Sequence, residues 1–340
     1  MPVTCGGRRC RASARRTIGS AAVVDAATST TGDAARGGGL DPEVCAHWRL
    51  TPGPALGHRA SGTWAATREK AAFVVKHVDP RIFPDWPYTL RVAAALRAQG
   101  WPTPEPAEEP WIRPDGAWVL FHRLPGRSMT PADGDRSAEA RARGRLLAEF
   151  HASAAATGIV DQRGGFADPA ELVRDPLLDH WLRVHERYRP DEGRPLRACR
   201  DATAAWFADN PVVDAPRSVI HGDFTPWNLL FDGGRLSGVV DFEATHHTYQ
   251  VADFALSWRG YQDDVLRGYD EVRRLSDVEW RLVRPAFWAW MFIGLTDLLA
   301  ARYGDARRDA APPTLEWQVR HLRLHSPLLA TKAGVPTRNG

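Results

Sequence analysis

The sequence has 340 residues and a mass of 37.6 kDa, which is enough for one large domain or two. Hydrophobic residues make up 44% of the chain, which excludes a wholly disordered protein. The formal net charge is +3, but residues 1–40 hold six arginines and two aspartates, so the rest of the chain carries about −1. That balance excludes a general basic surface, and we expect no nucleic-acid partner.

Residues 1–40 are rich in Gly, Ala, Ser, Thr and Arg and contain three consecutive glycines near their end. Such a composition buries too little apolar surface to fold, so we predict a disordered tail. An organelle transit segment and a start codon assigned too far upstream are the alternatives. The tail has no apolar run suited to a signal peptide, and the four cysteines form no disulfide or zinc pattern, so we expect a cytoplasmic protein with reduced thiols.

Residues 41–123 have the pattern of a small β-rich lobe that contains one helix. The runs 64–67 and 71–76 are short and apolar enough for two paired strands. Residues 88–99 carry apolar side chains at helical spacing, and Gly100 is a stop signal directly after them. A further apolar run at 118–121 predicts another strand near the end of this lobe.

Residues 124–335 are mainly helical in pattern, which predicts a second, larger lobe and an α+β fold class. Amphipathic spacing predicts a helix over 137–153. Two strand-like runs, 229–232 and 236–242, are joined by Asp-Gly-Gly, a hairpin signal. The most apolar run, 285–299, is shorter than the roughly 20 residues of a membrane span, so we expect a buried helix and no membrane partner. Further helical segments are expected at 170–190, 196–208, 250–270, 276–303 and 314–323.

The most informative stretch is His221-Gly-Asp-Phe-Thr-Pro-Trp-Asn228, followed by Asp241-Phe-Glu243. Asp223, Asn228 and Asp241 together supply a set of oxygen ligands, which suits Mg²⁺ bound with phosphate oxygens. Aspartate and asparagine are also common turn formers, so the spacing of Asp223 and Asn228 alone has a plain structural explanation. The preceding His-Gly, the proline inside the loop and the aspartate after a strand favour a catalytic site.

This segment resembles the catalytic and metal loops of the aminoglycoside phosphotransferase / choline kinase family, small-molecule relatives of the protein kinases. The resemblance implies a bilobal protein-kinase-like fold and transfer of the γ-phosphoryl group of ATP or GTP to a hydroxyl of a small molecule. It implies that Asp223 is the catalytic base and that Asn228 and Asp241 hold Mg²⁺ against the phosphates. The order of motifs matches over residues 48–300, and the specific part is 219–254.

The resemblance also implies nucleotide contacts from the small lobe. Lys76, on an apolar strand, would contact the α- and β-phosphates, and its presence in a chain with so few lysines favours this over a surface position. The loop from Gly57 to Gly62 would cover the phosphates, although it lacks the lysine of a P-loop. Phe121 and His122 begin a segment that resembles the interlobe linker where adenine docks; a plain loop is the alternative.

Two residues are expected to support the catalytic loop and two positions depart from the family pattern. The resemblance assigns structural support to His221 and Asp253. Relatives place a glutamate in the small-lobe helix to pair with the strand lysine, but the matching position, counted back from Gly100, is Thr89. Asp85 is one substitute, and a shifted register is another explanation.

The second departure is Thr225, where many relatives carry His or Lys. Neither departure removes the base or the metal ligands, so we expect an active kinase. A nucleotide-binding pseudokinase or regulatory module without turnover is the alternative.

The acceptor is constrained only weakly. Residues 255–300 contain seven acids and six arginines, a near-neutral balance that argues against a polycation. No long activation segment follows Asp241, so a protein acceptor is not expected. An apolar or sugar-stacking pocket and packing in the helical core are the two readings of four aromatic residues, Trp258, Tyr261, Trp288 and Trp290.

Overall fold

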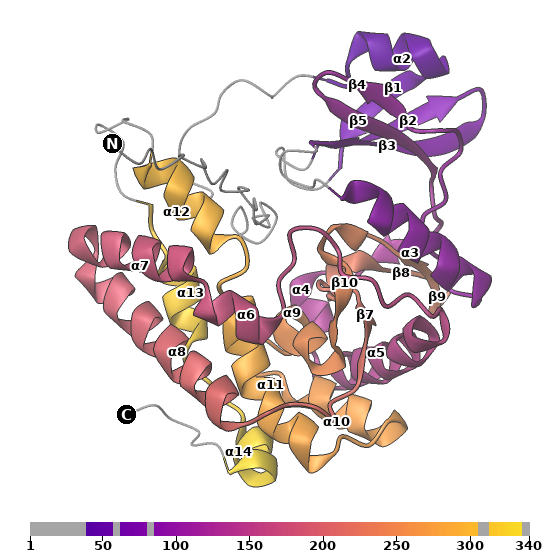
Figure 1. Ribbon diagram of the computed structural model, residues 1–340. Coiled ribbons are helices and arrows are strands. Elements are labelled where there is room, and N and C mark those ends of the chain that lie inside the picture. Colours follow the sequence, from indigo (N-terminus) through magenta and orange to yellow (C-terminus); the bar gives the residue numbers. More distant parts are fainter. Residues whose placement is uncertain (1–38, 57–61, 80–84, 305–312, 335–340) are drawn as a thin grey trace, which may run out of the picture.

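The computed structural model describes residues 39–56, 62–79, 85–304 and 313–334 (Figure 1). The predicted tail, apart from its last two residues, and Gly57 lie outside these ranges. An antiparallel sheet of five strands forms near the N-terminus, and the remainder is mostly helical, so the predicted α+β class is confirmed. All five strands lie within 41–123, while the lobe boundary at 123 stays a prediction.

The N-terminal sheet has the strand order β1-β2-β3-β5-β4. The predicted pairing of two strands is confirmed, with Thr63 opposite Lys76. Successive residues of β5 point to opposite faces: Trp118 and Leu120 pack toward α2 (Pro42–Trp48), and Val119 packs toward α3 (Trp86–Ala98). The strands are β1 (Thr51–Ala55), β2 (Thr63–Arg68), β3 (Ala71–Val78), β4 (Trp111–Arg113) and β5 (Gly116–His122).

The helical part surrounds one continuous apolar core. Its closest helix pair is α5 and α10: a Cβ added to Gly144 would lie 2.0 Å from the backbone oxygen of Val265, and one added to Gly268 would lie 1.9 Å from that of Arg141. Glycine therefore allows these two backbones to touch. The helices are α4 (Pro131–Gly134), α5 (Ser137–Ala156), α6 (Pro169–Arg174), α7 (Pro176–Tyr188), α8 (Pro190–Asp209), α9 (Phe254–Trp258), α10 (Asp263–Val272), α11 (Asp277–Trp290), α12 (Leu295–Tyr303), α13 (Glu316–His321) and α14 (Pro327–Ala333).

Three predicted helices are shorter in the structure than the sequence pattern indicated. The segment 170–190 divides at Asp175, which caps α7. The segment 250–270 divides after α9, where Arg259 has a left-handed backbone with φ 55°. The segment 276–303 divides at Gly294, with φ 74°. This last segment is long and apolar enough to cross a membrane, but 78% of its most apolar window is buried in the protein, as predicted for a core helix.

Two small sheets hold the segment that contains the predicted catalytic residues. β8 (Leu229–Asp232) and β9 (Arg235–Val239) form the predicted hairpin, and Gly233 and Gly234 both have positive φ, as a type I′ turn requires. β6 (Arg127–Ser128) extends this hairpin to three strands. β7 (Arg217–Ile220) pairs with β10 (His246–Tyr249), a pairing that the sequence analysis missed.

Candidate active site

The loop after β7 brings Asp223 and Asn228 close together. The backbone nitrogen of Thr225 and the side-chain Nδ2 of Asn228 both donate to the backbone oxygen of Asp223, at 2.9 and 3.0 Å. Pro226 begins a short 3₁₀ helix that ends at Asn228, and its fixed φ suits that position. The loop is therefore closed by its own hydrogen bonds between the two predicted functional residues.

Asp253 holds the start of this loop by hydrogen bonds. Its carboxylate accepts hydrogen bonds from the backbone nitrogens of His221 and Gly222, both at 2.7 Å, and from Nε2 of His151 at 3.0 Å. Burial raises the pKa of Asp253, but the hydrogen bond and charge of His151 outweigh that effect, and the pKa is lowered. Gly222 has φ 80°, and a Cβ there would lie 2.4 Å from the oxygen of Ala244. Asp253 therefore bonds to the first two residues of the catalytic motif, and its supporting role in catalysis stays a prediction.

His221 joins the catalytic loop to the strand that leads to Asp241. Its Nδ1 accepts from the backbone nitrogen of Asp223 at 3.2 Å, and its Nε2 lies 3.1 Å from the backbone oxygen of Val240. These partners require a neutral ring with the hydrogen on Nε2. Burial lowers the pKa of His221, which favours the same neutral form.

The carboxylate of Asp223 is the least satisfied group in the loop. Its Oδ1 is buried and has no hydrogen-bond partner within the part of the chain that the structure describes. Burial raises the pKa of Asp223 to about 7, and the negative charge of Asp241 adds to the effect. A buried acceptor without a partner is unusual in a folded protein, and the role of Asp223 as the base stays a prediction.

Lys76 contacts two carboxylates of the metal loop. Its Nζ lies 3.0 Å from Oδ1 of Asp241 and 2.8 Å from Oε1 of Glu243. Burial lowers the pKa of Lys76, but the two carboxylates outweigh it and the pKa is raised, so the lysine stays charged. Burial likewise raises the pKa of Asp241, but Lys76 outweighs it and the pKa is lowered. Asp241 has a left-handed backbone with φ 67°, a strained conformation typical of functional sites.

The proposed substitute for the missing helix glutamate is wrong. The carboxylate of Asp85 accepts from the backbone nitrogen of Gly164 at 3.2 Å, and Thr89 donates to the backbone oxygen of Trp86. The acidic partners of Lys76 are Asp241 and Glu243, and sequence reasoning missed Glu243 in this role. The only signal for it was the spacing of Asp and Glu in the metal loop.

The remaining nucleotide-site predictions lie in or beside the N-terminal sheet. Gly62 has φ 56°, and its backbone oxygen accepts from the nitrogen of His77 at 2.7 Å. Phe121 and His122 are the last two residues of β5, so the connection to the helical part begins after them. The backbone nitrogen of His122 donates to the oxygen of Glu105 at 3.0 Å. Their contact with a nucleotide stays a prediction.

The four aromatic residues considered for an acceptor pocket separate into two groups. Trp258, Trp288 and Trp290 are buried in the helical core, so core packing is the correct reading for them. Tyr261 is 45% exposed, and Trp227 of the catalytic loop is 37% exposed. Sequence reasoning missed Trp227, although it lies inside the catalytic motif.

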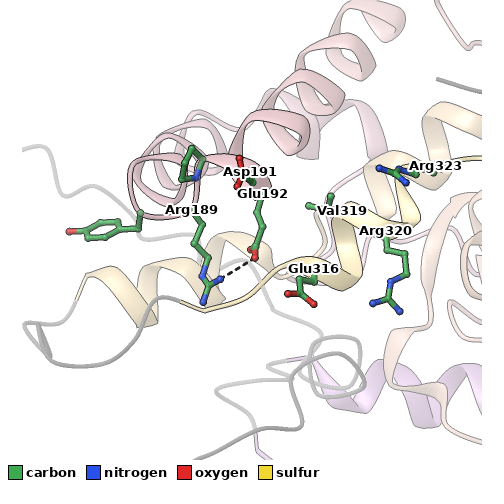
Figure 2. Close-up of a pocket in the computed structure, with 9 residues that line it drawn as sticks. Arg189, Asp191, Glu192, Glu316, Val319, Arg320 and Arg323 are labelled. Atoms are coloured by element: carbon green, nitrogen blue, oxygen red, sulfur yellow. Dashed lines mark hydrogen bonds and ion pairs between the residues drawn. The ribbon is translucent and has the colours of Figure 1, made fainter. Parts of the chain in front are cut away.

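A cavity of about 650 Å³ lies elsewhere, between the start of α8 and α13. Figure 2 shows its charged lining, including the ion pair of Arg189 with Glu192. None of the predicted site residues lines it. Its lining residues are Tyr188, Arg189, Pro190, Asp191, Glu192, Glu316, Val319, Arg320 and Arg323.

Comparison with known structures defines the class of fold. The chain resembles amicoumacin kinase hAmiN in complex with AMP-PNP, Ca²⁺ and Ami, with a TM-score of 0.57 and 15% identity over 88% of this chain and 91% of that one. It resembles a thermostable mutant of aminoglycoside phosphotransferase APH(4)-Ia, apo form, with a TM-score of 0.60 and 16% identity over 87% of this chain and 100% of that one. These likenesses show a protein-kinase-like fold.

Comparison with known sequences defines the family. Residues 54–286 match the phosphotransferase enzyme family. The chain is 30% identical over 265 residues to homoserine kinase of Brucella melitensis, which covers 71% of this chain and 76% of that protein. It is 31% identical over 169 residues to homoserine kinase of Gluconobacter oxydans, but that match spans only 46% of this chain and 50% of that protein. The chain belongs to the phosphotransferase enzyme family.

Proposed function

We propose that this protein transfers the γ-phosphoryl group of ATP or GTP to a hydroxyl group of a small molecule, with Mg²⁺ as the metal. The observation that carries the proposal is the convergence of Asp223, Asn228, Asp241 and Lys76 at the ends of the two small sheets and the facing strand β3. Family membership supports the same reaction. The composition further supports a cytoplasmic protein without a nucleic-acid or membrane partner.

Asp223 is the proposed general base. Asp223 is half-buried, and its Oδ1 has no partner among the described residues, so the fold leaves part of the acceptor capacity of this carboxylate unused. A carboxylate whose pKa is raised to about 7 holds a proton more readily than an ordinary aspartate, which suits a base near neutral pH. Asp253 and His221 hold the backbone on which Asp223 is mounted.

Asn228 and Asp241 fit Mg²⁺ by their donor chemistry. Asn228 uses Nδ2 to donate to the backbone oxygen of Asp223, so its Oδ1 is the atom that remains for a metal. Asp241 supplies a carboxylate with a lowered pKa, which stays ionised. Mg²⁺ prefers such hard oxygen ligands, and a bound ion would neutralise phosphate charge in the transferred group.

Lys76 is the proposed phosphate contact. It is held from the opposite side of the site by Asp241 and Glu243, and its raised pKa keeps the positive charge that a phosphate requires. Glu243 takes the positioning role that a helix glutamate has in relatives.

The acceptor that we propose to test first is L-homoserine, because the matching curated proteins are named homoserine kinases. The experiment measures Mg²⁺-dependent nucleotide consumption by the purified protein with and without L-homoserine and a panel of other hydroxylated compounds. The proposal predicts consumption that requires both the metal and an acceptor. Nucleotide binding without turnover on any acceptor would support the pseudokinase alternative instead.

A further inference from the structure

A cationic and aromatic surface lies beside the catalytic loop. The guanidinium carbon of Arg259 is 6.0 Å from the ring centroid of Trp227 and 5.3 Å from that of Tyr261. Both rings are partly exposed, at 37% and 45%. Arg259 also forms an ion pair with Asp135 through Nη2. We call these four residues the Arg259 cluster.

The cluster is close to the proposed base. Trp227 follows Asp223 by four residues, so their Cα atoms are at most about 14 Å apart even in an extended chain. The loop is more compact than that, because it folds into a short 3₁₀ helix with hydrogen bonds back to Asp223. Gly134, at the end of α4, packs directly on Pro226, since an added Cβ would lie 2.3 Å from the proline ring. Asp135 follows Gly134, so it lies beside the catalytic loop that contains Pro226.

The Asp135 carboxylate of the cluster also faces a second arginine outside it, Arg143. Arg143 lies 3.6 Å from the same Asp135 carboxylate, so two guanidinium groups share one negative charge. Arg143 is 3% exposed and bonds to Ser257 and to the backbone of Gly134, so it is enclosed by the fold. Burial lowers the pKa of His321, and the charge of Arg259 adds to that effect. Of the two arginines, Arg259 is the more accessible, with 15% of its side chain exposed against 3% for Arg143.

Arg259 also keeps donors that the fold does not use. Within the described ranges, its contacts with Asp135 use Nη2 alone, which leaves Nη1 for a ligand, while its Nε is buried without a hydrogen-bond partner. Its backbone is left-handed, with φ 55°, at a helix end where glycine is usual. A strained arginine with spare donors, next to two exposed rings, has the properties of a ligand-binding residue.

We propose that Arg259 binds a carboxylate of the acceptor, with Trp227 and Tyr261 on either side of the acceptor's carbon chain. This inference rests on the proposed function, and it narrows the acceptor to a hydroxylated carboxylic acid or amino acid. An arginine fork matches the geometry of a carboxylate and binds it by charge-assisted hydrogen bonds. The two guanidinium groups that share the Asp135 carboxylate, those of Arg259 and Arg143, disfavour a polycationic acceptor at this surface.

The test compares acceptors that carry a carboxylate with acceptors that lack it. L-Homoserine, L-serine and L-threonine are each assayed beside the corresponding carboxamide, and hygromycin B serves as the polycation. The wild-type protein is predicted to prefer the carboxylate over its amide by at least about 10-fold in kcat/KM. Arg259→Gln is predicted to lower kcat/KM for the carboxylate by about 10- to 150-fold, the range for a lost hydrogen bond to a charged group. In this variant, kcat/KM for the amide and the KM for ATP are each expected to change by less than about threefold.

Two further variants separate binding from folding. Arg281→Gln alters an exposed arginine on α11 and is predicted to leave both acceptor types unchanged. Arg259→Lys keeps the charge without the fork and is predicted to fall between wild type and Arg259→Gln. Equal losses on carboxylate and amide in Arg259→Gln, or a wild-type enzyme that uses the amide or hygromycin B as well as the carboxylate, would overturn the inference.

Failure of the proposed function has a different signature, namely no phosphorylation of any compound by wild type. In that case calorimetric binding of L-homoserine in the presence of ADP decides the inference. Binding that is lost in Arg259→Gln and kept in Arg281→Gln supports it, and the absence of binding to wild type overturns it.

Discussion

Replacing Asp253 with asparagine tests how the catalytic loop is held. The carboxylate accepts three hydrogen bonds, from the backbones of His221 and Gly222 and from His151. An asparagine keeps one acceptor oxygen and places an NH₂ group against at least one of these buried donors. A charged hydrogen bond contributes about 1.5–3 kcal/mol, and a buried donor left unsatisfied costs about 1–3 kcal/mol. We therefore expect the free energy of unfolding to fall by about 3 kcal/mol.

The consequence for activity is separable from the consequence for stability. Because the loop carries Asp223, misplacement by about 1 Å lowers kcat by up to about 100-fold at a temperature where Asp253→Asn is fully folded. Urea unfolding and steady-state kinetics on the same preparation give both quantities. Asp232→Asn, at an exposed position of the β8–β9 hairpin, is the matched control and is expected to change neither. An Asp253→Asn protein as stable and as active as this control would refute the reasoning.

Three further predictions follow from the charged groups of the site and core. Asp241→Ala is expected to abolish Mg²⁺-dependent nucleotide use more completely than Asn228→Ala, because a carboxylate neutralises the metal and an amide only completes its coordination; equal turnover of Asp241→Ala and wild type at saturating Mg²⁺ would exclude the metal assignment. Glu243→Gln is expected to raise the KM for ATP by about 3- to 10-fold, because Lys76 loses a charged hydrogen bond that orients it. An unchanged KM would show that Glu243 does not position Lys76. Burial lowers the pKa of His246 to about 4. The stabilising contribution of the neutral ring is therefore complete above its unfolded pKa of about 6.5 and is lost as pH falls from there toward 4. The free energy of unfolding should fall between pH 7 and pH 5 by about 2 kcal/mol more in wild type than in His246→Asn.

The elements that were predicted correctly are those with local sequence signals. The β8–β9 hairpin follows from Gly233-Gly234, and the pairing of β2 with β3 follows from two apolar runs separated by a short turn. β7 and β10 were missed because each has four residues, and their pairing joins segments that are far apart in the sequence. The predicted helices were too long because the apolar pattern continues through Gly294 and Arg259, while the backbone turns there.

The site shows the same division between local and distant information. The spacing of Asp223 and Asn228 is local, and the structure closes the loop between them as the motif implies. The acidic partners of Lys76 are Asp241 and Glu243, which are distant from it in the sequence. Counting along the small-lobe helix led instead to Thr89, with Asp85 as a substitute, and neither contacts Lys76. Trp227 was overlooked because sequence alone does not show which aromatic side chains remain exposed.

The central claim is that Asp223 is the general base, and Asp223→Asn tests it most directly. Asparagine keeps the size and one acceptor oxygen but cannot take a proton. Because Oδ1 of Asp223 has no partner among the described residues and its pKa is raised by burial, removing the charge should leave the protein at least as stable as wild type above neutral pH. ATP affinity, melting temperature and kcat are measured on one preparation. The account predicts ATP affinity within a few-fold, an unchanged or higher melting temperature, and a kcat lower by roughly 10²–10⁴. An unchanged kcat per folded molecule, with a lower melting temperature, would contradict it.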